Sequence, residues 1–154
     1  MTREQRSQAC YQELFDSTRC MIMSLSGLSS AALNDMGCEL GTNYDFFLAE
    51  YDGQYLFDSH VGFLEMLRQD PVPWPYNEYS SLNGLTLAQM FLVQAWHENE
   101  SARYCLNGDA AAHGWQQLDA VEVGVAAAVG AAKSLAYAMR LMAVGNNRLG
   151  QAPK

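Results

Sequence analysis

The sequence predicts a mainly α-helical protein, a helical bundle built around one long C-terminal helix. Apolar residues recur at helical spacing through most of the chain. Ser, Thr, Asp and Gly stand where such stretches begin and end, as helix caps do. A chain of 154 residues with 49% hydrophobic and 17% charged residues fits a single globular domain. We therefore expect one helical domain over residues 1–145 and a flexible tail over 146–154.

The N-terminal part is expected to form two helices. Thr2 is a suitable cap for a first helix over residues 3–25, in which apolar side chains follow every three or four positions. The sequence SGLSS then interrupts the pattern. Ser29 or Ser30 can cap a second, shorter helix over residues 31–40.

The segment 45–58 is ambiguous. Aromatic-rich runs flank Asp52-Gly53, a pair typical of a two-residue hairpin turn, so a small β-hairpin is the favoured prediction. The alternative is a short helix that stops at Gly53. A further helix is expected just before Pro71. Alternating prolines at 71, 73 and 75 then predict an extended backbone.

The C-terminal half is expected to form a helical hairpin. Residues 85–106 have helical periodicity, Asn107-Gly108 is a helix stop, and Asp109 can cap the next helix. That last helix is expected to run without a break from about 110 to 144.

The last predicted helix carries an apolar seam with heptad spacing. Its members are Leu118, Val121, Val125, Ala128, Ala132, Leu135, Met139 and Met142. A neighbouring stripe is made of mostly small residues: Val123, Ala127, Gly130, Ser134 and Ala138. Such a seam predicts the spine of an intramolecular bundle. The alternative is a structural homodimer formed through the seam of helix 110–144.

The net charge of −8 is concentrated in the middle third of the chain. Residues 31–84 hold nine of the 17 acidic residues and a single base, Arg68, whereas the rest of the chain is balanced. The same third holds ten of the seventeen aromatic residues. No surface concentrates Lys or Arg, so direct nucleic-acid binding is not expected. An acidic segment instead suits a protein partner with a basic surface.

The predicted partner-binding residues all lie in this acidic, aromatic third. The carboxylates are Asp45, Glu50, Asp52 and Asp58, and the aromatic anchors are Trp74, Tyr76 and Tyr79. Trp and Tyr are favoured interface anchors, and prolines stiffen the segment before it binds. The alternative interpretation is a connector whose aromatic side chains cover the core.

Catalytic and metal-binding signatures are missing from the sequence. The chain has no phosphate-binding loop, no nucleophile elbow and no Glu-x-x-His pair. An unbroken hairpin of helices 85–106 and 110–144 would place His97 opposite Leu118 and Asp119, far from His113. We therefore expect no metal, no cofactor and no catalytic residues. A small helical enzyme that uses His97 with nearby carboxylates is kept as an alternative.

The chain is expected to be cytoplasmic. No signal peptide is recognisable, and the four cysteines lack zinc spacing, as expected of reduced thiols. The stretch 124–145 is long enough to span a membrane, but Lys133 and Arg140 lie inside it, so we predict a packed helix. Together these patterns predict a small acidic inhibitor of the immunity or anti-defence type. It would occupy a basic surface of a toxin or a nucleic-acid-binding machine.

Overall fold

The computed structural model describes residues 2–42 and 85–150, and every regular element in these two ranges is a helix. The elements are α1 (Arg3–Ser26), α2 (Ser30–Thr42), α6 (Leu87–Leu106), α7 (Asp109–Ala112) and α8 (Gln117–Gly150). The prediction of a mainly α-helical fold with a long C-terminal helix is confirmed. The segment 45–58, the helix expected before Pro71 and the alternating prolines lie outside the described residues.

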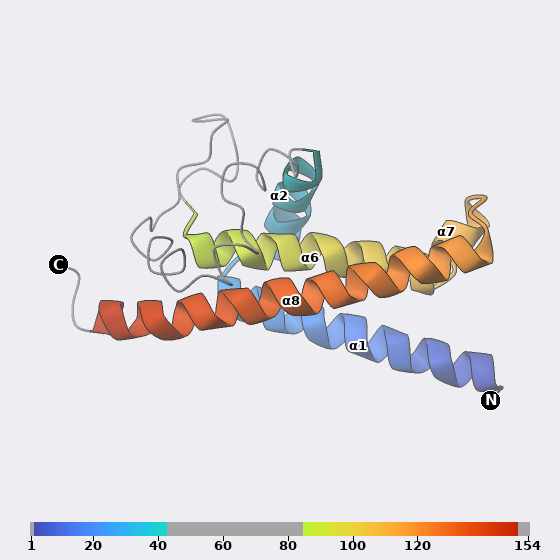
Figure 1. The fold of residues 1–154 in the computed structure, drawn as a ribbon, viewed down its shortest axis with the longest axis horizontal. Coiled ribbons are helices and arrows are strands. Elements are labelled where there is room, and N and C mark those ends of the chain that lie inside the picture. The colour runs from blue at the N-terminus through green and yellow to red at the C-terminus, as the bar shows by residue number, and fades with distance from the viewer. Residues whose placement is uncertain (1, 43–84, 151–154) are drawn as a thin grey trace.

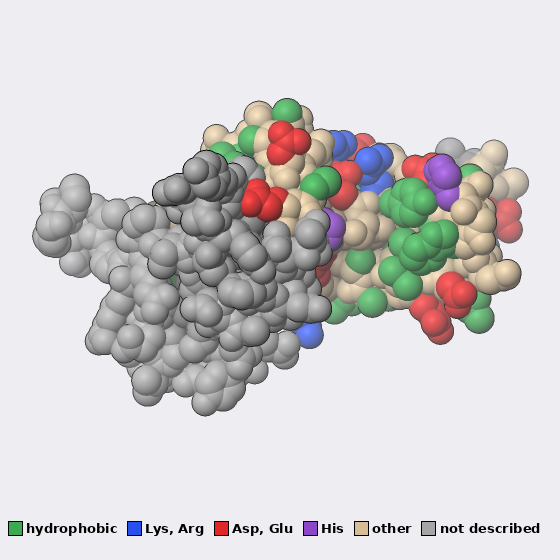
Figure 2. All heavy atoms as spheres, turned by 90° about the horizontal axis from the view of Figure 1, so that it is seen from above, with side chains coloured by type: hydrophobic (Ala, Val, Ile, Leu, Met, Phe, Trp, Pro, Cys, Tyr) green, Lys and Arg blue, Asp and Glu red, His purple; other side chains and the backbone are tan. Residues whose placement is uncertain are grey.

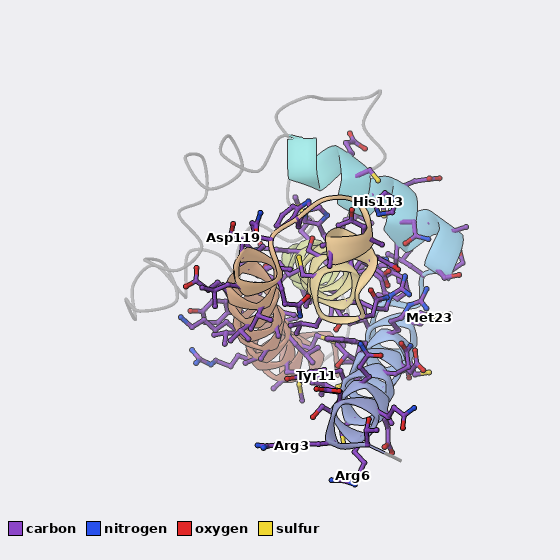
Figure 3. The ribbon with its side chains drawn as sticks, turned by 90° about the vertical axis from the view of Figure 1, so that its right-hand side faces the viewer. Arg3, Arg6, Tyr11, Met23, His113 and Asp119 are labelled. Atoms are coloured by element: carbon purple, nitrogen blue, oxygen red, sulfur yellow. The ribbon has the colours of Figure 1, made fainter. Side chains whose placement is uncertain are left out.

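α6 is the central helix of the bundle. Figure 1 shows α6 and α8 side by side over much of their length, α1 along the same direction and α2 crossing them steeply. The end-on view in Figure 3 places α6 in the middle, with α8 on one side and α1 and α2 on the other. All seven residues from Met90 to Trp96 are buried, as expected for a helix that is covered on several sides.

Two capping boxes fix the starts of α1 and α6. The backbone amide of Gln5 donates to Thr2 Oγ1 at 3.1 Å, and the backbone amide of Thr2 donates to Gln5 Oε1 at 2.7 Å. Thr86 and Gln89 repeat this reciprocal arrangement at 3.0 Å. Each box satisfies two backbone donors that a helix start leaves without partners. The predicted start at Thr2 is confirmed.

Polar side chains of α6 attach it to the middle and the end of α1. Gln89 Nε2 donates to the carbonyl of Ser26 at 3.1 Å, and Asn99 Nδ2 donates to the carbonyl of Phe15 at 3.2 Å. Asn99 is buried, so its hydrogen bond offsets the cost of removing an amide from water. Ser29 Oγ accepts from the amide of Ala32 at 3.1 Å, which confirms the predicted cap before α2.

The hairpin between α6 and α8 differs from the predicted one. Residues 113–116 are not helical, so α7 and α8 take the place of the single helix expected over 110–144. Gly114 there has a φ of 98°, a left-handed conformation that side chains with a Cβ rarely adopt. Asp109 is the first residue of α7 rather than a cap, which is Gly108. α8 runs on to Gly150, past the end predicted near 144.

The longer turn changes which residues of α6 and α8 face each other. Ser134 lies against Glu98, with its hydroxyl donating to the carboxylate at 2.9 Å. Asp119 is fifteen residues before Ser134 on α8, which at 1.5 Å per residue is about 22 Å away along the helix. The predicted pairing of His97 with Asp119 is therefore wrong.

Candidate functional site

The seven predicted partner-binding residues lie outside the described residues. Asp45, Glu50, Asp52, Asp58, Trp74, Tyr76 and Tyr79 all fall within 43–84. Their assignment to a binding surface stays a prediction. Of the nine acidic residues in the middle third, Asp35 and Glu39 are described, and both lie on α2. Asp35 is exposed, whereas Leu33 and Gly37 on the same helix are buried.

Glu98 is a half-buried carboxylate enclosed between α6 and α8. Its carboxylate accepts from Ser134 and lies so close to Gly130 that a Cβ at that position would collide with it. Burial raises the pKa of Glu98, and side-chain hydrogen bonds with Gln94 and Ser134 partly oppose that rise. Because Gly130 has no side chain, it leaves room for the carboxylate. The acid points into the helix contact rather than toward solvent.

His97 points to a different neighbour. A Cβ on Gly37 would stand 3.5 Å from the His97 Cβ, so His97 packs against α2. Burial lowers its pKa, which favours the neutral imidazole. His97 and Glu98 are consecutive on α6 and therefore diverge, one toward α2 and the other toward α8. This geometry does not form a histidine–carboxylate dyad.

A third polar cluster joins α1, α2 and α6. Glu100 forms ion pairs of 2.9 Å with Arg19 on α1 and with Arg103 on its own helix. The Arg19 guanidinium lies 5.0 Å from the ring centre of Trp96, whose Nε1 donates to Asn34 Oδ1 at 2.7 Å. Each charged group here has a partner, and Arg19 with Glu100 joins α1 to α6. The cluster is best explained as a structural junction.

Metal binding finds no support within residues 2–42 and 85–150. No three His, Cys, Asp or Glu side chains converge there. The four cysteines are free, with Cys105 buried and Cys10, Cys20 and Cys38 exposed. Burial raises the pKa of the Cys105 thiol, which disfavours the reactive thiolate.

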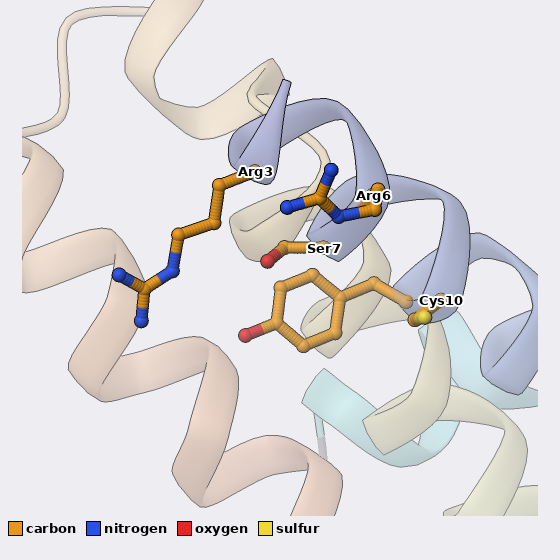
Figure 4. A pocket seen from close by; sticks show the side chains of 5 residues that line it. Arg3, Arg6, Ser7 and Cys10 are labelled. Carbon is orange, nitrogen blue, oxygen red and sulfur yellow. The ribbon is translucent and has the colours of Figure 1, made fainter. Parts of the chain in front are cut away.

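The hollow shown in Figure 4 is an open surface feature of a single helix. Arg3, Arg6, Ser7, Cys10 and Tyr11 line it, and all belong to the first turns of α1. A ligand site normally encloses its ligand with side chains from several elements. This hollow therefore does not define a binding pocket.

The inward side of α8 is built from small residues, contrary to the seam predicted from heptad spacing. Over residues 117–143, where burial is described, the buried positions are Ala120, Gly124, Ala131, Ser134, Ala138 and Leu141. Such small side chains let α6 and α8 approach closely, and a Cβ on Gly124 would stand 2.6 Å from Leu106 Cγ. The prediction that the apolar seam is the spine of the bundle is wrong for most of its members.

The apolar seam of α8 instead lies largely at the surface. Leu118 is 72% exposed, and Val125 and Met139 are each 49% exposed. Val129, which the predicted seam did not include, is 51% exposed. Only Leu135 and Met142 of the seam pack against the main core. Large exposed apolar side chains in a row are typical of interaction surfaces.

A second exposed apolar group lies at the turn between α6 and α8. The Tyr104 ring stacks on His113 at 5.8 Å and meets Trp115 edge-on at 6.5 Å. Trp115 is 42% exposed and Tyr104 is 36% exposed. Figure 2 shows hydrophobic side chains gathered beside a histidine at this end of the molecule. The sequence pattern does not indicate this group, because its members become neighbours only through the turn at 113–116.

α8 also has the length and the apolar composition of a membrane-spanning helix. Of the described helices it alone does so, over Gln117–Ala143, and 22% of its most apolar stretch is buried. Core helices of globular proteins pass the same test but are mostly buried. α8 is therefore an apolar helix of which most of this stretch is not buried.

Comparisons of this chain with protein families, with curated proteins and with solved structures found no match.

The half-buried Glu98 predicts a pH-dependent stability difference. The folded protein holds the Glu98 proton more tightly than the unfolded chain, because burial raises the pKa above the ordinary 4.5. The free energy of unfolding therefore loses a contribution as pH rises from 4.5 through the folded pKa. Glu98→Gln removes that loss and keeps an acceptor for Ser134. Relative to wild type, the variant should gain stability as pH rises toward neutral.

Urea unfolding at several pH values between 4 and 7 measures this difference. Glu13→Gln is the matched control, because Glu13 is exposed on α1. A stability difference for Glu98→Gln that stays constant over this range would contradict the assigned burial.

Proposed function

We propose that this protein is a small acidic binding protein that occupies a basic surface of a partner protein. The single observation that carries the proposal is the charge distribution, with nine acids and one base in residues 31–84. Such a local excess of one sign steers association with an oppositely charged surface. An inhibitor of a toxin or of a nucleic-acid-binding machine is the class of protein that best suits this mode of action.

The aromatic residues of the same segment support the proposal. Trp74, Tyr76 and Tyr79 stand among three prolines, so they combine large contact areas with a stiffened backbone. The carboxylates Asp45, Glu50, Asp52 and Asp58 would supply long-range attraction. Among the described residues, Asp35 on α2 is a further exposed carboxylate of this acidic segment.

Affinity capture from a lysate of the native host tests the proposal. Tagged wild-type protein should retain one basic protein at low salt and lose most of it at high salt, because exposed charges are screened. Asp52→Lys with Asp58→Lys should abolish capture at low salt. Glu4→Lys with Glu13→Lys is the matched control, since it makes the same charge change on α1 and should leave capture intact.

Two results would count against the proposal. Capture that resists high salt would mean that charge does not drive binding. Equal loss of capture in both double variants would mean that overall charge matters and that residues 31–84 hold no special surface.

A further inference from the structure

We propose that the outward side of α8 binds a second copy of this chain, with the two α8 helices antiparallel. The surface is the outward row, which runs along α8 at alternating spacings of four and three residues. Its members, all exposed, are Leu118, Glu122, Val125, Val129, Ala132, Ala136, Met139 and Ala143. This inference does not depend on the acidic segment 31–84.

The outward row lies opposite the side of α8 that packs on α6. Around the helix, Val129 in the middle of the row is about 200° from buried Ala131, and Ala132 is about 100° from it. The row contains one charged residue, Glu122, in about 40 Å of helix. A helix that is apolar on both sides is normally covered on both sides. The spacing of four and three is the pattern by which helices pair along a seam.

The sizes of the side chains favour an antiparallel pair. The first half of the row holds Leu118, Val125 and Val129, whereas the second half holds mostly alanine. If the two-fold axis passes between Gly130 and Ala131, Val129 faces Ala132 of the second copy and Val125 faces Ala136. Leu118 then faces Ala143. Leu118, Val125 and Val129 each meet an alanine, which allows close packing at these positions, and Glu122 faces Met139.

A parallel pair lacks this fit. Alanine would face alanine in the second half of the row, and Glu122 would face Glu122 of the second copy. Like charges placed directly opposite each other destabilise an interface. The antiparallel pair avoids both defects.

The charges beside the row also favour the antiparallel pair. Asp119, Ala126, Lys133 and Arg140 form a flanking row with a spacing of seven residues, and all four are exposed. Two-fold symmetry places the flanking row of one copy against the flanking row of the other. Asp119 then lies beside Arg140 of the second copy, and Ala126 beside Lys133 of the second copy. Within its own chain, the Arg140 guanidinium lies 5.4 Å from the Tyr137 ring centre. The pair thus gains two ion pairs by symmetry.

The outward row supplies a large part of the area that a specific dimer needs. Stable interfaces remove roughly 800 Å² from each partner. The outward row extends along about 40 Å of a helix about 10–12 Å across, a strip of about 400–480 Å², and the flanking row must supply the rest. A lipid bilayer fits the same side less well, because Glu122 in the row and Lys133 and Arg140 beside it would lie in hydrocarbon.

Sedimentation velocity over a range of protein concentrations tests the proposed dimer. Wild-type protein should pass from monomer to dimer as concentration rises. Val129→Glu should weaken dimerisation about tenfold or more, because two carboxylates then meet at the two-fold axis. Ala126→Glu is the matched control: it adds the same charge on the same helix but faces Lys133 of the second copy. It should leave the dimer intact or strengthen it.

A charge swap tests the antiparallel direction. Asp119→Arg alone and Arg140→Asp alone should each weaken the dimer, and the double variant should restore it. Restoration is expected only if residues 119 and 140 of different copies are neighbours. Circular dichroism of each variant checks that the monomer is folded.

Several outcomes would overturn the proposal. These are a wild-type monomer at all concentrations, a dimer that Val129→Glu leaves unchanged, and a swap that restores nothing. Co-sedimentation of monomeric protein with phosphatidylcholine vesicles, abolished by Val129→Glu, would assign the same side to a membrane instead.

Discussion

Trp96→Ala is expected to lower the free energy of unfolding by about 3–5 kcal/mol, the range for removing a large aromatic side chain from a core. Trp96 is 1% exposed and belongs to the main core, together with Val93 and Met90. Its loss also removes the hydrogen bond to Asn34 and the surface on which Arg19 rests. Because proteins of this size are stable by only about 5–15 kcal/mol, the variant should be close to unfolding at 37 °C.

Trp115→Ala is the matched control for Trp96→Ala. Trp115 is 42% exposed, and its aromatic contact is with Tyr104 at the surface. Its removal should change the free energy of unfolding by about 1 kcal/mol or less. Chemical denaturation followed by circular dichroism measures both variants. Equal effects of the two substitutions would contradict the central position of α6.

Gly124→Leu is the second substitution with a large expected effect. A Cβ at 124 would stand 2.6 Å from Leu106 Cγ and 2.9 Å from Cys105 Cβ, both close to the backbone of α6. The helices would have to move apart, which we expect to cost about 2–3 kcal/mol. Glycine is a poor helix former, so its replacement recovers about 1 kcal/mol of that cost.

Ala126→Leu is the control for Gly124→Leu, because it enlarges an exposed residue two positions further along α8. Thermal unfolding at low protein concentration compares the two variants. A melting temperature of Gly124→Leu at or above that of Ala126→Leu would be incompatible with the close contact between α6 and α8.

The helix starts were predictable from sequence because the capping signals are local. Thr2 with Gln5 and Ser29 with Ala32 make the expected hydrogen bonds within three residues. The break at 113–116 was not predicted, since the alanines before and after it continue a helical pattern. Gly114 was the available signal, and its φ of 98° explains why the helix ends there. Because this interruption was not predicted, the residues of α8 expected to face α6 were wrong, including the expected neighbour of His97.

The orientation of α8 could not be predicted from its pattern alone. Apolar residues occupy both sides of the helix, so heptad spacing identifies seams without saying which one faces inward. The sizes of the side chains decide which side of α8 packs on α6. Glycine, alanine and serine let α6 approach closely, whereas Val125, Val129 and Met139 would keep it further away. The predicted partner-binding residues, from Asp45 to Tyr79, lie outside the described residues, and they remain predictions.

α8 turns its small residues toward α6 and its outward row away from it. Adjacent alanines give the most direct test, because Ala131 is 4% exposed and Ala132 is exposed, whereas the predicted seam placed Ala132 inward. The measurement is the melting temperature of Ala131→Glu against that of Ala132→Glu, at concentrations low enough to keep the protein monomeric. Ala131→Glu should melt roughly 10 °C lower, since it buries a charge, and Ala132→Glu should melt near wild type. The opposite order would mean that α8 is turned the other way and that the outward row is the core.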